Sequence, residues 1–485
     1  MSDIRNLEPK ALWNYFHEIT QIPHPSKNEK KLAEYVVKFG KSHGLETMVD
    51  KAGNVIIRKP ATKGMENRKM VIFQTHLDMV PQKNSDKKHN FETDPIETQI
   101  DGEWVRANGT TLGSDNGIGV ATSLTVLASK ELVHGPLEAL FTVDEETGMT
   151  GVFGLEPGVL KGDILLNLDS EDEGELYVGC AGGIDVSARK KYAEEDSPKG
   201  MIAYRVAAKG LKGGHSGVDI HLGRANSNKL MFRFLMQAEH DFGIRLAESS
   251  GGDLRNAIPR ESYTILLVPE SKAAEFESFV GRYEKTYKAE FSETEPGLSF
   301  TCEKVNLPAK VMKTGDQYGI IRAIFICPCG IQRMSQAMKG LVETSNNVAI
   351  VKCKNGLFEV YNLTRSSVDS AKEATAWKIA AVFQLIGAEV ELEGGYPGWK
   401  PNVNSPILKT MSKVYSGMFG KTPEIKAIHA GLECGILGGV YPNLDMISFG
   451  PTIRYPHSPD EKVLIPSVTK FYDFLCGTLK EIPVK

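Results

Sequence analysis

The chain of 485 residues lacks the sequence features of several large protein classes. No apolar stretch approaches the roughly 20 residues that a membrane-spanning helix needs. The first ten residues, MSDIRNLEPK, show no basic start followed by an apolar segment, so we expect no secretory signal. The formal net charge is −4, which leaves no excess of basic side chains to attract nucleic acid. We therefore expect a cytoplasmic protein without a membrane or nucleic-acid partner.

Cysteine is also scarce, with seven residues at irregular spacing. This favours the reduced thiols of a cytosolic protein over a disulfide framework. Cys327 and Cys329 form a C-x-C pair that a redox or metal site could use, but so short a motif is weak evidence. We interpret the cysteines as structural thiols, and the role of this pair stays open.

The sequence does contain an alternation of helical and strand patterns over its first 185 or so residues. Leu12, Phe16 and Ile19 have the spacing of one helix face, and residues 26–29 have the pattern of a capping box before a second helix. Four apolar runs predict strands that are covered on both faces, at 55–58, 71–75, 137–143 and 164–168. The succession predicts an α/β domain with a mixed, mostly parallel sheet covered by helices.

Near residue 187 the pattern changes to that of a second, α+β domain. Asn355-Gly356, between two apolar runs, is the strongest short-range signal for a β-hairpin. Residues 447–457 later resume the strand-then-polar pattern of the first domain, so the second domain is expected to be inserted. We expect a catalytic domain of residues 1–186 and 397–485, with the insert at 187–396. The elements expected in the insert are strands at 201–208, 263–268, 348–352 and 357–363 and helices at 226–239, 272–291 and 371–387.

Five side chains that commonly bind divalent metals each follow an apolar run or open a helix. They are His76, Asp115, Glu146, Asp169 and His457. Two histidines and three carboxylates suit a pair of divalent ions, with zinc as the default and cobalt or manganese as alternatives. A metal-binding side chain can follow one apolar run or open one helix by chance, but this is far less expected at all five positions. The pattern therefore predicts a hydrolase that activates water between two metals.

Each member of this set has a simpler interpretation when taken alone. His76 and Asp78 lie on the same side of an extended chain, which suits a carboxylate behind a metal-bound histidine but also a satisfied polar pair. Asp115 could be an ordinary helix N-cap, and its neighbouring glycines lack the spacing of a dinucleotide-binding loop. The acidic run 144–146 could be a solvated turn. Alternatively, one glutamate could bind metal while its neighbour accepts a proton from the water.

Several longer stretches resemble the co-catalytic zinc peptidase family that includes aminoacylases, succinyl-diaminopimelate desuccinylase and carnosinases. They lie between about residue 22 and about residue 470 and include HLDMVPQ, GTTLGSDNGIG, DSEDEGE, GCAGGID, LKGGHSG, RNAIPR, HAGLECG and GPTIRYPHSPDE. The region around 318–333, which contains the C-x-C pair, shows no signature of the family. The resemblance implies a catalytic domain with an inserted lid domain. It also implies hydrolysis of a broad range of unblocked dipeptides, including Xaa-His and β-alanyl-histidine.

The resemblance also implies which residue binds which metal. His76 and Asp169 would bind one ion, Glu146 and His457 the other, and Asp115 both. Two ions per chain are thus expected.

For the remaining residues, the resemblance implies catalytic and substrate-binding roles. Glu145 would be the general base, and Asp78 the carboxylate behind the first metal-binding histidine. His215 in LKGGHSG would help to hold the reacting carbonyl oxygen, often across the interface of a homodimer formed through the lid domain. Arg365, or more weakly Asn256, would bind the terminal carboxylate of the substrate. The simpler alternatives are a turn histidine between glycines and an arginine exposed on a strand.

Three other functions stay open at this stage. A related deacylase or carboxypeptidase could use the same scaffold. A metal-dependent binding protein without catalysis could also keep the fold, although the Glu145-Glu146 pair argues against it because binding needs no spare base. A dinuclear phosphohydrolase would use similar ligands, but the sequence shows no phosphate-binding cradle.

Overall fold

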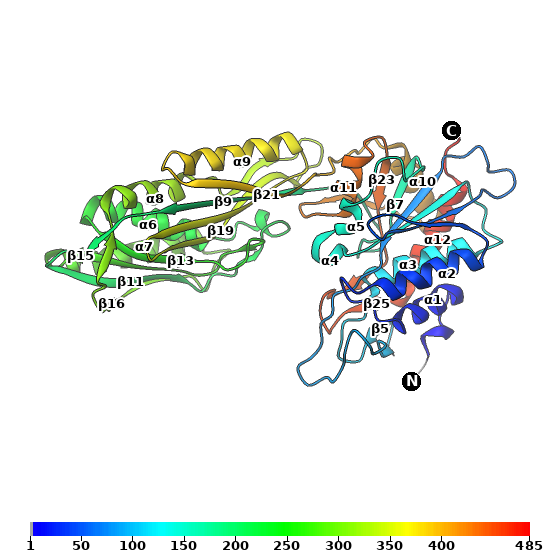
Figure 1. Cartoon of the computed structure of the whole chain (residues 1–485), viewed down its shortest axis with the longest axis horizontal. Coiled ribbons are helices and arrows are strands. Elements are labelled where there is room, and N and C mark those ends of the chain that lie inside the picture. Colours follow the sequence, from blue (N-terminus) through cyan, green and yellow to red (C-terminus); the bar gives the residue numbers. More distant parts are fainter. Residues whose placement is uncertain (1–2) are drawn as a thin grey trace. The chain divides into compact units, whose positions relative to one another are not determined.

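The computed structural model describes residues 3–485, which divide into two compact units (Figure 1). Unit 1 contains residues 3–179, 401–427 and 432–485, and unit 2 contains residues 180–400 and 428–431. Unit 2 is therefore inserted into the chain of unit 1. The expected boundary at 186/187 falls inside strand β9 (Gly182–Lys191), and that at 396/397 falls at the end of β21 (Glu389–Tyr396). The four-residue return to unit 2 at 428–431 has no periodic signal and was not predicted.

Unit 1 is built on an eight-stranded sheet in the order β1-β2-β6-β3-β7-β23-β8-β22. The four central strands β6, β3, β7 and β23 pair in parallel, and the pairs β1-β2, β2-β6 and β23-β8 are antiparallel. Every residue of β3, β6 and β7 is buried, as their continuous apolar runs predict. The strands are β1 (Glu46–Val49), β2 (Val55–Lys59), β3 (Val71–His76), β6 (Leu137–Thr142), β7 (Ile164–Asn167), β8 (Glu175–Cys180), β22 (Glu424–Ile428) and β23 (Asp445–Ser448). The predicted mixed α/β class is confirmed.

Helices and a small sheet complete unit 1. The α1 helix packs against α3, and α10 packs against α12. A four-stranded sheet, β24-β25-β5-β4, frames the loop that carries His457. These elements are α1 (Lys10–Thr20), α2 (Lys30–Ser42), α3 (Ser114–Ala128), α4 (Glu145–Gly148), α5 (Thr150–Phe153), α10 (Pro406–Phe419), α11 (Glu433–Val440), α12 (Ile465–Lys480), β4 (Thr98–Asp101), β5 (Trp104–Ala107), β24 (Ile453–Arg454) and β25 (Lys462–Leu464). Within residues 3–485, none of the helices combines the length and apolar character that a bilayer crossing requires.

The expected capping box at residues 26–29 is not formed. The α2 helix begins at Lys30, and Glu29 stands at the N-cap without a side-chain hydrogen bond to the helix. Ser26 instead donates to the carbonyl of Met79, from its backbone N–H at 3.1 Å and its hydroxyl at 3.3 Å. This long-range pairing holds Ser26 in a turn, closed by a hydrogen bond from Asn28 N–H to the carbonyl of Pro25 at 2.8 Å, and the local sequence pattern could not reveal it.

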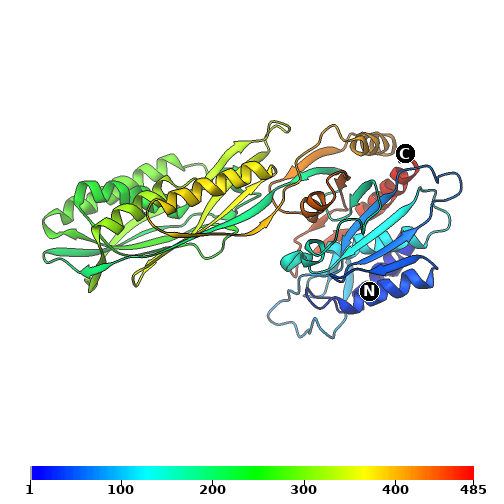
Figure 2. The same ribbon diagram turned by 45° about the horizontal axis from the view of Figure 1, so that its top comes forward.

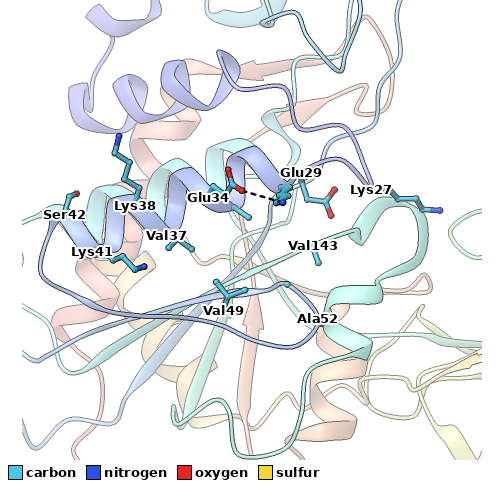
Figure 3. A pocket seen from close by; sticks show the side chains of 13 residues that line it. Lys27, Glu29, Glu34, Val37, Lys38, Lys41, Ser42, Val49, Ala52 and Val143 are labelled. Atoms are coloured by element: carbon cyan, nitrogen blue, oxygen red, sulfur yellow. Dashed lines mark ion pairs between the residues drawn. The ribbon is translucent and has the colours of Figure 1, made fainter.

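A surface groove of about 900 Å³ lies between α2 and the β1–β2 turn (Figure 3). Its apolar lining includes Val37 and Val49, and Lys38 and Lys41 also line it. None of the five predicted metal-binding residues lines this groove. The five predicted metal-binding residues lie elsewhere in unit 1, away from this groove.

Unit 2 is built on an antiparallel sheet in the order β16-β11-β15-β13-β19-β20-β9-β21, with β18 also paired to β19. The hairpin predicted at Asn355-Gly356 is confirmed. Both residues have positive φ, 53° and 74°, as a type I′ turn requires. The other strands of this sheet are β11 (Met201–Lys209), β13 (Arg245–Gly251), β15 (Ser262–Pro269), β16 (Ser299–Val305), β18 (Gly330–Met334), β19 (Val342–Lys354) and β20 (Leu357–Ser366).

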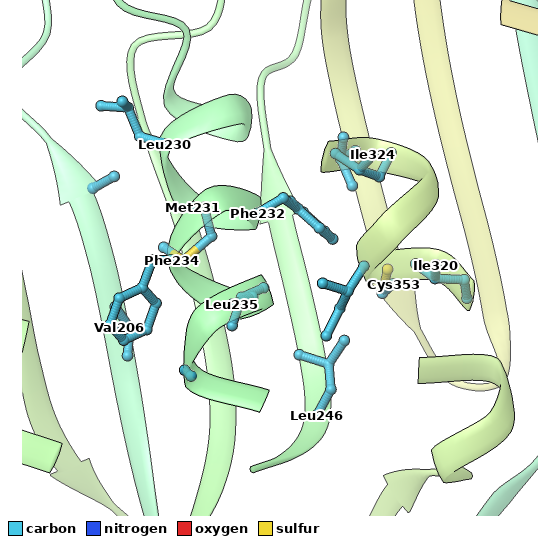
Figure 4. Packing of buried hydrophobic residues seen from close by; sticks show 14 of the residues in the cluster. Val206, Leu230, Met231, Phe232, Phe234, Leu235, Leu246, Ile320, Ile324 and Cys353 are labelled. Carbon is cyan, nitrogen blue, oxygen red and sulfur yellow. The ribbon is translucent and has the colours of Figure 1, made fainter. Parts of the chain in front are cut away.

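Four helices lie along one face of this sheet (Figure 2). They are α6 (Ser227–Phe242), α7 (Ala273–Glu290), α8 (Thr314–Ile326) and α9 (Asp369–Gln384). Figure 4 shows Met231 and Phe234 of α6 on the side of Val206 of the sheet, and Leu246 belongs to the same buried cluster. The α8 helix lies in the region without family signature and was not predicted.

No disulfide joins the seven cysteines. Cys327 follows α8 and is buried, and burial raises the pKa of its thiol to about 12. A thiol that stays protonated is a poor nucleophile and a poor metal ligand.

Candidate metal centre and substrate-binding residues

The parallel strands of unit 1 bring distant parts of the sequence to one edge of the sheet. His76 is the last residue of β3 and lies opposite Thr142, the last residue of β6. Gln74 of β3 lies opposite Asn167, the last residue of β7. The carboxylates that follow β6 and β7 therefore emerge beside His76. This carboxyl edge is where open α/β sheets place their ligands.

The five predicted metal-binding residues meet at this edge. The Nε2 of His76 lies 3.1 Å from Asp115 Oδ1 and 3.3 Å from Asp169 Oδ1. The Nε2 of His457 lies 3.3 Å from Asp115 Oδ2 and 3.0 Å from Glu146 Oε2. The two oxygens of Asp115 thus face different imidazoles. Single atoms of His76, Asp115 and Glu146 all lie within 4.8 Å of one another.

The backbone around Asp115 shows that this residue is not the N-cap of α3. Gly113 occupies the cap position with a φ of 71°, and Asp115 itself is non-helical, with φ −86° and ψ 104°. Asn116 donates from Nδ2 to the carbonyl of Leu168 at 2.7 Å. A Cβ at Gly119 would lie 2.6 Å from that same carbonyl, so glycine allows α3 to approach the end of β7. These contacts direct the carboxylate of Asp115 toward the histidines.

Glu461 fixes this loop from a distant part of the sequence. Its carboxylate accepts hydrogen bonds from the backbone N–H of Leu112 (2.7 Å), Gly113 (3.0 Å), Ser114 (2.7 Å) and Asp115 (3.3 Å). The hydroxyl of Ser114 donates as well, at 2.6 Å. Glu461 lies in the motif GPTIRYPHSPDE, but no local pattern indicated that its side chain would reach a loop near residue 113.

Asp78 connects His76 to the start of α4. Its carboxylate accepts the backbone N–H groups of Glu145 at 2.9 Å and Glu146 at 3.2 Å. The Nδ1 of His76 lies 3.4 Å from Asp78 Oδ1 and 3.0 Å from the carbonyl oxygen of Asp78. Burial opposes ionisation, but His76 and the backbone donors outweigh it and lower the pKa of Asp78 to about 2. Asp78 therefore stays negative and orients both its neighbours.

The charges gathered at this edge favour cations. Burial and the neighbouring acidic groups raise the pKa of Glu145 well above its usual value and that of Asp169 to about 6. Hydrogen bonds to Asp115 and Glu146 raise the pKa of His457 to about 11. Glu146 Oε1 is buried and has no hydrogen-bond partner. Clustered carboxylates with an unpaired buried oxygen are costly unless cations neutralise them, so these residues fit divalent metals.

Two further carboxyls near this edge, the buried Glu433 and the half-buried Glu171, were not predicted as site residues. Glu433 opens α11 and accepts hydrogen bonds from Gln74 and, at 2.8 Å, from the hydroxyl of Thr142. Burial raises the pKa of Glu433 to about 8, and burial together with Asp115 and Asp169 does the same for Glu171. Both lie in quoted motifs, HAGLECG and DSEDEGE, which could have drawn attention to them. Neither directly follows a buried strand, so the search for polar residues at strand ends did not identify them.

Within unit 2, His215 and Arg365 have environments that differ from those of ordinary surface residues. The Nδ1 of His215 accepts the backbone N–H groups of Gly217 and Val218, each at 3.1 Å. Its Nε2 is therefore the protonated nitrogen and is available to donate. Arg365 is only 5% exposed, so the alternative of an exposed strand charge is wrong. Asn256 is exposed, and its carbonyl accepts the N–H of Ser216 at 2.8 Å.

Comparison with known proteins gives relatives over the whole chain. The peptidase family M20/M25/M40 matches residues 72–481. The cytosol non-specific dipeptidase of Escherichia coli K12 is 48% identical over 487 residues, which cover 100% of both chains. The crystal structure of aminoacylhistidine dipeptidase from Vibrio alginolyticus is 49% identical, with a TM-score of 0.96 over 100% of this chain and 99% of that one. An aminopeptidase structure from Bacillus cereus, at 16% identity and a TM-score of 0.58 over 98% and 99%, shares the fold.

Proposed function

Because the chain belongs to peptidase family M20/M25/M40, we propose that it is a cytoplasmic, metal-dependent dipeptidase that hydrolyses unblocked dipeptides. The relatives that match its full length are named dipeptidases. The structural observation that carries the proposal is Asp115, whose two oxygens face two different imidazoles beside an adjacent glutamate pair. The proposed substrates include Xaa-His and β-alanyl-histidine. The cytoplasmic location rests on the name of the Escherichia coli relative and on the reduced-thiol pattern.

The proposed centre binds two divalent ions, with zinc as the default. His76 and Asp169 would hold one ion and Glu146 and His457 the other, and Asp115 would serve both. When bound, two such ions polarise the scissile carbonyl and lower the pKa of a bound water. Asp78 supports this arrangement by orienting His76 and the backbone of the glutamate pair.

Glu145 is the proposed general base. Its neighbour Glu146 faces His457, whereas within residues 3–485 no ion pair engages the carboxyl of Glu145. Glu145 is therefore available to take a proton from the attacking water and to return it to the leaving nitrogen.

The proposed substrate contacts lie in unit 2. His215 is neutral at pH 7 because burial and the charge of Arg365 lower the pKa of its imidazole. A neutral imidazole with a protonated Nε2 can donate to the carbonyl oxygen as negative charge develops there. Arg365 would bind the terminal carboxylate of the dipeptide, and Asn256 is the weaker candidate for the same task.

Chelation followed by reconstitution tests the proposed function. The purified protein is expected to hydrolyse β-alanyl-histidine and other free dipeptides, to lose this activity after chelation and dialysis, and to regain it with zinc, cobalt or manganese. A tripeptide and an N-acetyl amino acid are the matched substrate controls. Activity that survives metal removal would refute the metal centre. Faster turnover of the N-acetyl amino acid or the tripeptide would indicate a deacylase or another peptidase instead.

We also propose that the protein forms a homodimer through unit 2. Large apolar side chains stay exposed on α8 (Tyr318, Phe325 and Ile326), on α9 (Trp377) and directly after α9 (Leu385). Exposed apolar patches on soluble proteins commonly mark interaction surfaces.

Replacing Trp377 by glutamate is expected to convert the dimer to a monomer, because the charge would have to be buried in the interface. Sedimentation velocity measures the mass of each form. The control is Lys378→Glu, an exposed neighbour on the same helix. A wild-type protein that sediments as a monomer at micromolar concentration would contradict the proposed dimer.

A further inference from the structure

Four residues of unit 2 form one row across neighbouring strands. Ser345 lies opposite Arg365, Arg365 lies opposite Gly183, and Gly183 lies opposite Tyr396. Directly opposed residues of antiparallel strands place their side chains on the same face of the sheet. Gly183 contributes no side chain, so the row contains a gap between Arg365 and Tyr396.

The ring of Tyr396 occupies this gap. A Cβ at Gly183 would lie 2.7 Å from the Cε1 and 2.8 Å from the hydroxyl oxygen of Tyr396, closer than real Cβ contacts allow. Only glycine therefore lets the ring lie across β9. In this position, the hydroxyl oxygen of Tyr396 accepts a hydrogen bond from Nη1 of Arg365 at 3.0 Å. Lys372 also donates to the backbone carbonyl of Tyr396 and ties its strand to α9.

Arg365 is buried without a carboxylate of its own. Its Nε is buried and has no hydrogen-bond partner, and the side-chain partner of its Nη1 is a neutral phenol. Asp185 lies near enough to sense its charge but forms an ion pair with Arg255 at 3.2 Å. A buried guanidinium in this state is costly until an anion arrives, and a guanidinium fork matches a carboxylate with two parallel hydrogen bonds.

A buried imidazole also senses the charge of Arg365. His429 is buried and its Nε2 contacts the hydroxyl of Ser345 at 2.7 Å. Burial, followed by the charges of Arg365 and His215, lowers the pKa of His429 to about 3. This imidazole therefore stays neutral and adds no charge of its own beside the guanidinium.

We propose that Tyr396 is a positioning residue that fixes the guanidinium of Arg365 for the terminal carboxylate of the substrate, in a space that Gly183 keeps open. This inference rests on the proposed role of Arg365 in binding that carboxylate. The hydrogen bond to Tyr396 engages Nη1 and stops rotation of the guanidinium. Its remaining N–H groups then point in a fixed direction. Orienting a binding group before the substrate arrives lowers the cost of binding.

The test compares a dipeptide with the same dipeptide amidated at its C-terminus, using the metal-reconstituted enzyme. In Tyr396→Phe, the KM for the free dipeptide is expected to rise about 10-fold or more, because a hydrogen bond to a charged group is lost. The kcat should change by less than about twofold, and the kinetics of the amide should not change. Tyr361→Phe is the matched control, since its hydroxyl bonds at 2.8 Å to Glu359 on the same strand, β20, and not to Arg365. Equal losses on both substrates, or no loss on either, would overturn the positioning role.

Two further variants separate this inference from the proposed function. Gly183→Ala should show the same selective rise in KM, because the added methyl displaces the Tyr396 ring, and circular dichroism checks that it folds. Arg365→Lys should reduce the preference for the free dipeptide over the amide. If Arg365→Lys leaves that preference unchanged, the carboxylate-binding role of Arg365 and the positioning of its guanidinium both fail. If Arg365→Lys lowers the preference and Tyr396→Phe does not, only the positioning role fails.

Discussion

Replacement of Glu145 by glutamine is expected to reduce kcat on a dipeptide by about 10²–10⁴-fold while the metals remain bound. The amide keeps the shape of the side chain but cannot accept the proton of the attacking water. Metal binding should persist because Glu146, and not Glu145, faces His457 at 3.0 Å. Steady-state kinetics and elemental analysis on the same preparation measure the two quantities independently.

The control for this prediction is Glu156→Gln. Glu156 is a surface residue of unit 1 whose carboxylate pairs with Lys51 at 2.7 Å, and an exposed ion pair of this kind contributes little. It should leave both kcat and metal content unchanged. A Glu145→Gln enzyme with near-normal kcat would show that another group removes the proton. Loss of metal together with activity would make Glu145 a ligand instead.

Replacement of Asp115 by alanine is expected to abolish activity by removing metal from both positions. One oxygen of Asp115 lies 3.1 Å from His76 and the other 3.3 Å from His457, so its loss affects the surroundings of both imidazoles. A variant that removed a ligand of only one ion, such as Asp169→Ala, should keep part of the metal. Elemental analysis after exhaustive dialysis gives the number of ions per chain in each case.

Asp172→Ala serves as the control, because Asp172 lies on the same acidic loop as Asp169 but pairs with Arg454 at 2.7 Å. It should retain full metal content. Asp115→Asn, which keeps the side-chain volume, shows whether any loss in the alanine variant reflects misfolding. If Asp115→Ala binds as much metal as the wild-type protein after dialysis, Asp115 does not link two ions.

The parts of the site that could be predicted from sequence share a local signature. His76 and Glu146 follow short apolar runs, and parallel strands that are buried on both faces leave such runs in the sequence. Because the carboxyl ends of parallel strands meet at one edge, the order of runs and polar residues was enough to place these side chains together. The Asn355-Gly356 hairpin was predictable for a similar reason, since its backbone conformation depends on two adjacent residues.

The remaining features depend on contacts that no local pattern encodes. Glu461 reaches the loop before α3, and the ring of Tyr396 lies over Gly183 because strands distant in sequence are neighbours in a sheet. The capping box failed for the same reason, because Ser26 pairs with Met79 and not with the helix that follows it. The structural roles of Gly183 and Glu461 can therefore be recognised only once the fold is known.

The position of Glu461 has a consequence for the time at which activity can arise during synthesis. Glu461 lies 349 residues after Leu112, whose N–H it accepts, and the whole of unit 2 is translated between them. During synthesis, the hydrogen bonds that Glu461 accepts from the segment before α3 cannot form until residue 461 has emerged from the ribosome. Until then, the loop that carries Asp115 lacks the carboxylate that accepts its backbone N–H groups in the folded protein. We therefore expect the complete centre to form late in synthesis, after residue 461 has emerged.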